Sequence, residues 1–311
     1  MDRPALRFLI GTLLCLACAS LPAQMYQWKD ADGHVHFGDR APQASSAREL
    51  TVNHSGRQAP LQIRFLAREF ALTPEQEQRV RDGIQRIHHF YRRQFGLDLH
   101  GTTEVNIYLM ADQAHFRQWM KERVGGSSNF YAGVFIPGRN ELAVWPWSDN
   151  PDDIVETLLH EANHVVLNQL SPRAPVWLHE GLSQYFQTLK VYQDRAWVTA
   201  LPDAKKRIKA WIGNGKLITL RQYLSIDDRQ WQRMAHQLDA IPYTVAWATT
   251  AFLMSEPSGR RTLKRMLQDL EKTDQRPTLQ RLDALYPGGI TQLEYHFFRW
   301  AQGDMPPQAV D

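Results

Sequence analysis

The sequence predicts an α+β protein in two parts: a small N-terminal β-hairpin module, then a domain in which helices cover a small mixed sheet. Two observations predict this class. Short stretches of alternating polar and apolar residues are typical of strands, and longer stretches carry apolar residues at helical spacing. With 311 residues, of which 43% are hydrophobic and 22% charged, the chain can bury a sizeable core. This composition excludes a disordered or collagen-like chain.

The first 23 residues have the pattern of an export signal. Two arginines precede an apolar stretch at residues 8–16, and small residues follow up to Ala23. Cleavage there predicts a periplasmic or secreted protein. Lipoprotein processing before Cys18 is less favoured, because Cys15 stands where a lipid-attachment signal usually carries Leu. These are the only cysteines, so the mature chain has no thiol for a disulfide or a metal.

Residues 24–42 predict the small β module. Two short alternating stretches flank Asp32-Gly33, a dipeptide typical of tight turns. The segment resembles the domain of unknown function 4124, a module of exported bacterial proteins, and the resemblance implies no chemistry. The residues that follow its pattern are Tyr26, Trp28, Asp30, Gly33, His36, Phe37 and Asp39. Residues 43–60, rich in Ala, Ser, Gln and Pro, predict a linker.

The predicted domain over residues 61–311 mixes strands and helices. A helix start is recognised at Thr73, an N-cap residue followed by Pro74 and by Gln76 at the third helical position. Strands are expected at 61–70, 104–110, 130–135 and 141–145, and helices at 73–95, 112–124 and 150–167. The segments 190–238 and 263–311 are expected to form mainly helical cover.

Charge and hydropathy exclude two classes of partner. The 36 basic and 33 acidic residues leave a net charge of +3 without runs of one sign, so we expect no nucleic-acid partner. Beyond the N-terminal signal no apolar stretch has the length of a membrane helix, so we expect no stable membrane span. The oligomeric state stays open.

The chemistry is expected at His160-Glu161-Ala162-Asn163-His164, an HExxH motif. Helical positions four apart differ by about 40°, so the imidazoles of His160 and His164 can bind one Zn²⁺. Glu161 projects about 100° away, where it cannot be a ligand but can reach a zinc-bound water. We expect Glu161 to be the general base. Alternatively, the two histidines are core residues with ordinary hydrogen-bond partners.

A hydrolytic zinc site needs a third protein ligand. Leu167 and Leu170 stand where the extended HExxHxxGxxH motif requires Gly and His, so the third ligand must come from elsewhere. Residues 175–186 read Pro-Val-Trp-Leu-His-Glu-Gly-Leu-Ser-Gln-Tyr-Phe. They follow His164 at a distance that allows a turn and an antiparallel helix.

This segment and HExxH together resemble the gluzincin metallopeptidases, closest to the peptidase MA-like branch. The signature there is Trp-Leu-x-Glu-Gly, and its Glu is the third zinc ligand, so the resemblance implies this role for Glu180. Two alternatives stay open: an exposed Glu180 on an ordinary amphipathic helix, and His179 as the ligand. The resemblance also implies a zincin-like fold for the domain.

Further residues are proposed on weaker grounds. Gluzincins similar to aminopeptidase N stabilise the oxyanion with a Tyr about sixty residues beyond the Glu ligand, which implies this role for Tyr243; its alternative is packing at the start of an apolar helix. The segment Gly138 to Glu141 only partly resembles the aminopeptidase motif that captures the substrate amine. The strand Glu141 to Trp145 is expected to be the sheet edge that pairs with an extended substrate.

The sequence therefore predicts an exported zinc-dependent metallopeptidase of gluzincin type, which hydrolyses peptide or protein substrates with a zinc-activated water. Zn²⁺ is the only cofactor expected. The alternative is a non-catalytic cell-envelope binding or assembly protein, whose metal site is structural or vestigial.

Overall fold

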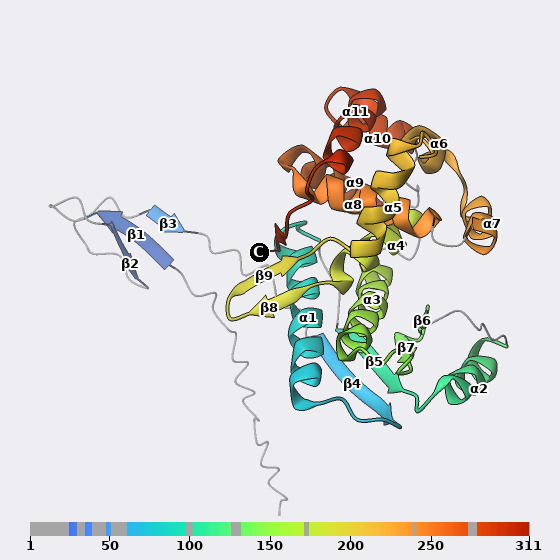
Figure 1. Cartoon of the computed structure of the whole chain (residues 1–311). Helices are drawn as coiled ribbons and strands as arrows, with labels where there is room; N and C mark the ends of the chain where they lie inside the picture. The colour runs from blue at the N-terminus through green and yellow to red at the C-terminus, as the bar shows by residue number, and fades with distance from the viewer. Residues whose placement is uncertain are drawn as a thin grey trace, which may run out of the picture. The chain divides into compact units, whose positions relative to one another are not determined.

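The computed structural model divides the chain into two compact units, residues 1–58 and residues 59–311 (Figure 1). It describes residues 25–29, 35–38, 48–50, 61–97, 102–125, 132–170, 174–238, 241–272 and 279–310. The expected signal peptide at residues 1–23 lies outside these ranges. Within them, no helix combines the length and the apolar composition that crossing a membrane requires.

The first unit contains an antiparallel sheet of three short strands in the order β2-β1-β3. They are β1 (Met25–Lys29), β2 (Val35–Gly38) and β3 (Arg48–Leu50). Strands β1 and β2 pair as the sequence predicts, with Trp28 opposite His36. Strand β3 lies inside the stretch expected to be a linker, so the sheet extends beyond residue 42.

The second unit begins with a mixed four-stranded sheet in the order β4-β5-β7-β6. Its strands are β4 (Leu61–Arg68), β5 (Thr103–Leu109), β6 (Gly133–Ile136) and β7 (Glu141–Val144). Strand β5 runs parallel to β4 and β7, and β6 runs antiparallel to β7. The α+β class with a small mixed sheet is thus confirmed.

The expectation that Glu141 to Trp145 forms the sheet edge is wrong. Strand β7 pairs with β5 on one side and with β6 on the other, so its backbone groups are already used. The edge is β6. The order of the strands depends on which ones pair, and alternation within one strand carries no information about pairing.

Helices cover both faces of this sheet. They are α1 (Pro74–Arg93), α2 (Gln113–Val124) and α3 (Pro151–Leu170). Helix α1 begins with the predicted capping box of Thr73 and Gln76. Helices α1 and α3 lie side by side over one face (Figure 1). On the other face, Phe116 and Trp119 of α2 pack against Ile136 of the edge strand.

The rest of the unit is largely helical. Its helices are α4 (Val176–Gln187), α5 (Pro202–Gly213), α6 (Leu220–Ser225), α7 (Asp228–Leu238), α8 (Ile241–Ser255), α9 (Pro257–Lys272), α10 (Leu279–Leu285) and α11 (Gly289–Gln302). A small antiparallel sheet joins β8 (Lys190–Tyr192), β9 (Arg195–Val198) and β10 (Gln308–Ala309). This sheet was not predicted, because strands of two to four residues are too short to show a period.

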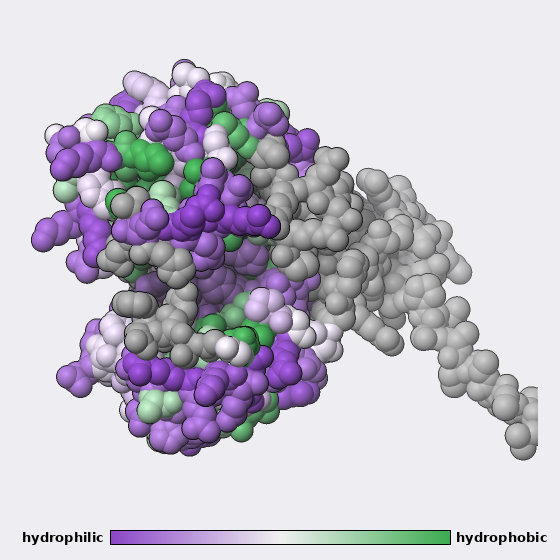
Figure 2. Space-filling view, turned by 90° about the vertical axis from the view of Figure 1, so that its right-hand side faces the viewer, coloured by the Kyte–Doolittle hydropathy of each residue, from purple (hydrophilic) through white to green (hydrophobic). Residues whose placement is uncertain are grey.

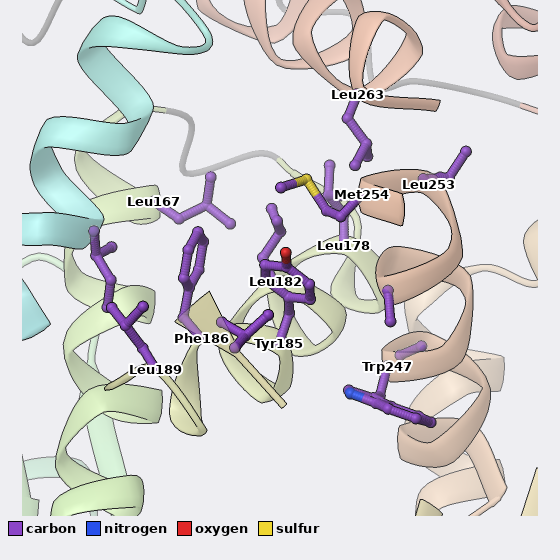
Figure 3. Close-up of a cluster of buried hydrophobic side chains, with 14 of the residues drawn as sticks. Leu167, Leu178, Leu182, Tyr185, Phe186, Leu189, Trp247, Leu253, Met254 and Leu263 are labelled. Carbon is purple, nitrogen blue, oxygen red and sulfur yellow. The ribbon is translucent and has the colours of Figure 1, made fainter. Parts of the chain in front are cut away.

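Helix α8 lies at the centre of the helical part and packs against α4. Its side chains from Thr244 to Met254 are all buried. Figure 3 shows Leu178, Leu182 and Phe186 of α4 gathered with Met254 of α8 in one apolar cluster.

The two helices approach closely at Gly181. A Cβ atom there would lie 2.6 Å from the carbonyl oxygen of Ala246, so only glycine permits this contact. Helix α4 is therefore held on its α8 side by backbone contact.

Candidate metal centre

Helix α3 presents the HExxH motif from a buried position. Asp152 and Asp153 lie in its first turn, where negative charge stabilises a helix N-terminus. Apolar residues around the motif, among them Leu159 and Val165, belong to the main core. The helix repeat then brings His160 and His164 to one face, and their Nε2 atoms lie 3.2 Å apart.

Helix α4 brings the carboxylate of Glu180 to the same point. Its Oε2 atom lies 3.5 Å from Nε2 of His160, and its Oε1 atom lies 3.7 Å from Nε2 of His164. Among the described residues, His160, His164 and Glu180 form the group whose ligand atoms converge within 4.8 Å of one another. The structure therefore brings together the three residues predicted as ligands.

The separations fit a single small cation. Tetrahedral ligands at the Zn–N and Zn–O distances of about 2.0–2.1 Å lie roughly 3.4 Å from one another. The two Nε2 atoms lie 3.2 Å apart, and the shortest distances from them to the two oxygens of Glu180 are 3.5 and 3.7 Å, all close to this value. Two nitrogens and one carboxylate oxygen are also a donor set that catalytic zinc uses.

A glutamine that the sequence analysis missed orients the first ligand. The Nδ1 atom of His160 lies 3.2 Å from Oε1 of Gln187 at the end of α4. Because an amide oxygen only accepts, Nδ1 donates this hydrogen bond, and Nε2 is the nitrogen left to bind a metal once its own proton is displaced. Gln187 follows Glu180 by two helical turns, so its place on the ligand face could have been predicted once a helix was assumed.

Helices α3 and α4 run antiparallel through the site, as the sequence predicts. Residues that come later on α3 contact residues that come earlier on α4. The contact pairs are His160 with Gln187, Asn163 with Ser183, and His164 with His179, whose rings lie 5.8 Å apart. His179 therefore lies beside a ligand but outside the converging group. Of the two candidates for third ligand, the geometry favours Glu180.

Glu161 is buried next to the ligands, with 7% of its surface exposed. Burial raises its pKa to about 7, against the opposing effect of His160. The edge strand passes directly over it, since a Cβ atom at Gly133 would lie 2.9 Å from Cγ of Glu161. Two residues along, the ring of Phe135 stacks on His164 with centroids 6.4 Å apart.

Two of the three ligands, His164 and Glu180, have the charge state that binding a cation requires. Burial lowers the pKa of His164 to about 3, so this imidazole is neutral at neutral pH. Burial opposes ionisation of Glu180. Its interactions with the imidazoles of His164 and His160 outweigh the effect of burial and keep the pKa of Glu180 below the usual value. Burial also lowers the pKa of His160, yet its hydrogen bond to Glu180 and the charges of Glu161 and Glu180 leave it raised.

Tyr243 lies in the first turn of α8, half-buried, with its ring edge-on to Trp231 at a centroid distance of 4.9 Å. It precedes Ala246, the residue that contacts Gly181 next to Glu180. The start of α8 therefore lies in the neighbourhood of the third ligand.

Comparison with protein families gives two matches. Residues 12–61 match a domain of unknown function, DUF4124, in agreement with the resemblance of the N-terminal module. Residues 154–279 match a protein family of unknown function, DUF1570. This second match includes every predicted site residue from His160 to Tyr243. No curated protein matches the chain.

Proposed function

We propose that this chain is an exported zinc-dependent metallopeptidase of gluzincin type. The observation that carries the proposal is the convergence of two imidazole nitrogens and one carboxylate from two helices, at separations of 3.2 to 3.7 Å. A buried glutamate next to this group, one position after the first histidine, supports hydrolysis over a purely structural metal site.

The donor set supports zinc. Neutral imidazoles and a carboxylate bind Zn²⁺ well, and three protein ligands leave a coordination position open for a water or substrate. His160 and His164 would contribute Nε2, and Glu180 one carboxylate oxygen. When bound, the zinc ion supplies an activated water and polarises the scissile carbonyl.

Glu161 would move the proton. Its carboxylate would accept a proton from the attacking water and return it to the leaving amine. A nearby dication would lower the pKa that burial raises to about 7, so the carboxylate is ionised when it acts as base. The phenol of Tyr243 would donate a hydrogen bond to the oxyanion of the tetrahedral intermediate.

The edge strand β6 supports an extended peptide as substrate. Its outer backbone groups are those of a sheet edge, which can pair with another strand. Its residues Gly133 and Phe135 face α3, over Glu161 and His164. On the side of α2 and α7, Figure 2 shows the surface hollowed between the helical part above and the sheet below.

An exposed aromatic side chain lies near the start of this edge. Trp147 keeps 46% of its surface exposed, and its indole N–H donates to Oγ1 of Thr157, 3.1 Å away. The methyl group of Thr157 and Cγ of Glu161 both lie next to the position that a Cβ atom of Gly133 would take. Trp147 would therefore offer an apolar surface to a substrate side chain close to the general base.

The test is metal analysis of the purified full chain, followed by digestion of a peptide library with and without a chelator. We expect about one zinc per chain and cleavage that the chelator abolishes and added zinc restores. Glu161→Gln is the matched control, because Gln fills the same space but cannot accept the proton; it should keep zinc and lose about 10³-fold in turnover.

Two results would reject the proposal. Absence of stoichiometric zinc would remove the metal centre. Stoichiometric zinc without any cleavage that differs between the parent and Glu161→Gln would instead support the alternative, a cell-envelope binding or assembly protein with a structural metal.

A further inference from the structure

Behind the ligands, three polar side chains form a chain of hydrogen bonds inside the core. The hydroxyl of Tyr91 on α1 donates to Oδ1 of Asn163 on α3, at 2.8 Å. The amide Nδ2 of Asn163 donates to Oγ of Ser183 on α4, at 2.9 Å. All three residues are fully buried, each with 0% of its surface exposed.

We infer that Tyr91, Asn163 and Ser183 form a polar clip that sets the register of α4 against α3 and so positions Glu180 for the metal. The inference rests on the proposed metal site. These are positioning residues, since none of them belongs to the converging ligand group. Asn163 also occupies one of the two positions of HExxH at which the motif specifies no residue type.

The place of the clip in the helix pair supports this role. Asn163 follows His160 by three residues, and Ser183 follows Glu180 by three residues, so on each helix the clip lies about one turn beyond a ligand. The hydrogen bond between Asn163 and Ser183 also lies between two other contacts of the helix pair. These are the contact of Gln187 with His160 and that of His179 with His164. The clip therefore lies in the middle of the interface that builds the site.

The metal site tolerates far less displacement than the surrounding core does. A shift of α4 by one residue moves Glu180 by about 1.5 Å along the helix, whereas metal–ligand distances vary by only about 0.2 Å. Apolar contacts such as that of Leu182 are not directional and resist such a shift weakly. A hydrogen bond between two buried side chains is directional and is lost on the same shift.

Stability alone does not explain why polar groups occupy these positions. Exchanging all partners of a buried hydrogen-bonded group for apolar residues of similar shape is often nearly neutral for stability. Buried polar residues are best attested as devices that select one register among several. The two hydrogen bonds also tie α1 to the interface, where the ring of Tyr91 lies 5.8 Å from that of Phe186.

The decisive experiment compares two hydroxyl deletions two residues apart on α4. Ser183→Ala removes the end of the clip. Tyr185→Phe removes the hydroxyl of another buried residue, which donates to Oε1 of Gln308 at 3.1 Å, far along the chain from the ligands. The measurements on the full chain are the zinc dissociation constant, by competition with a chromophoric chelator, and the melting temperature of the metal-free protein.

We expect Ser183→Ala to weaken zinc binding by about 10-fold or more, the usual cost of disturbing a group that orients a ligand. Tyr185→Phe should leave the zinc dissociation constant within about 2-fold, although both variants lower the melting temperature. A broadened visible spectrum of the Co²⁺-substituted Ser183→Ala protein should report the displaced ligand. Equal effects of the two substitutions on zinc binding would overturn the inference.

A second variant separates positioning from folding. In the triple variant Tyr91→Phe, Asn163→Leu and Ser183→Ala every clip partner is apolar, so no buried group is left unpaired. We expect its metal-free melting temperature to stay near that of the parent and its zinc affinity to fall by about 10-fold or more. Parent-like zinc affinity in this folded variant would also overturn the inference. If the parent itself binds no zinc, the proposed function fails first, which distinguishes the two failures.

Discussion

Helices α3 and α4 contribute to one site by different means. On α3, the local helix repeat is enough to bring His160 and His164 together. On α4, Glu180 reaches the site only because the helix packs antiparallel to α3 and, through Gly181, against α8. The two histidines therefore persist wherever α3 folds, whereas the third ligand depends on how α4 packs against α3 and α8.

The largest expected effect comes from removing the ligand that tertiary packing supplies. Glu180→Ala leaves the histidine pair on an intact α3, but two imidazoles alone lack the carboxylate that completes the site. We expect zinc to fall well below one per chain, activity to disappear, and the stabilisation by added zinc to be lost. Metal analysis and thermal unfolding with and without zinc check this.

The adjacent residue provides the control for that change. His179→Ala removes a ring that lies beside His164 but outside the converging ligand group. This variant should keep stoichiometric zinc. If the two outcomes were exchanged, His179 would be the ligand and the assignment of Glu180 would be wrong.

A smaller effect is expected at Tyr243, where packing and catalysis can be separated. If the phenol bonds only the transition-state oxyanion, Tyr243→Phe lowers kcat and kcat/KM together by about 10²-fold, roughly 3 kcal/mol. Zinc content and melting temperature should stay near those of the parent. A role in packing predicts the opposite: about 1 kcal/mol of lost stability with turnover nearly intact.

The smallest effect concerns how α4 orients a ligand of α3. Gln187→Leu removes the acceptor for Nδ1 of His160, and we expect about 10-fold weaker zinc binding with little change in the metal-free melting temperature. Gln169→Leu is the matched control, because that amide donates to the backbone oxygen of Glu104 instead. Equal zinc affinities in the two variants would show that α3 orients His160 without help from α4.

Local features of the fold were predictable because their causes are local. The capping box at Thr73 predicts the start of α1, and alternation predicts β5 within one residue at each end. The edge of the sheet was assigned to the wrong strand, because which strands pair depends on contacts far apart in sequence. The short strands β8 to β10 were missed for lack of any period.

The sequence alone predicts the ligand types and the close approach of His160 and His164, because helical spacing requires nothing beyond one helix. Through Trp-Leu-His-Glu-Gly it also indicated Glu180. Three contacts emerge only when the elements pack: Gln187 orients His160, Gly133 brings the edge strand over Glu161, and Asn163 bonds Ser183. Each of these contacts joins separate elements, so its geometry does not exist before the elements have packed.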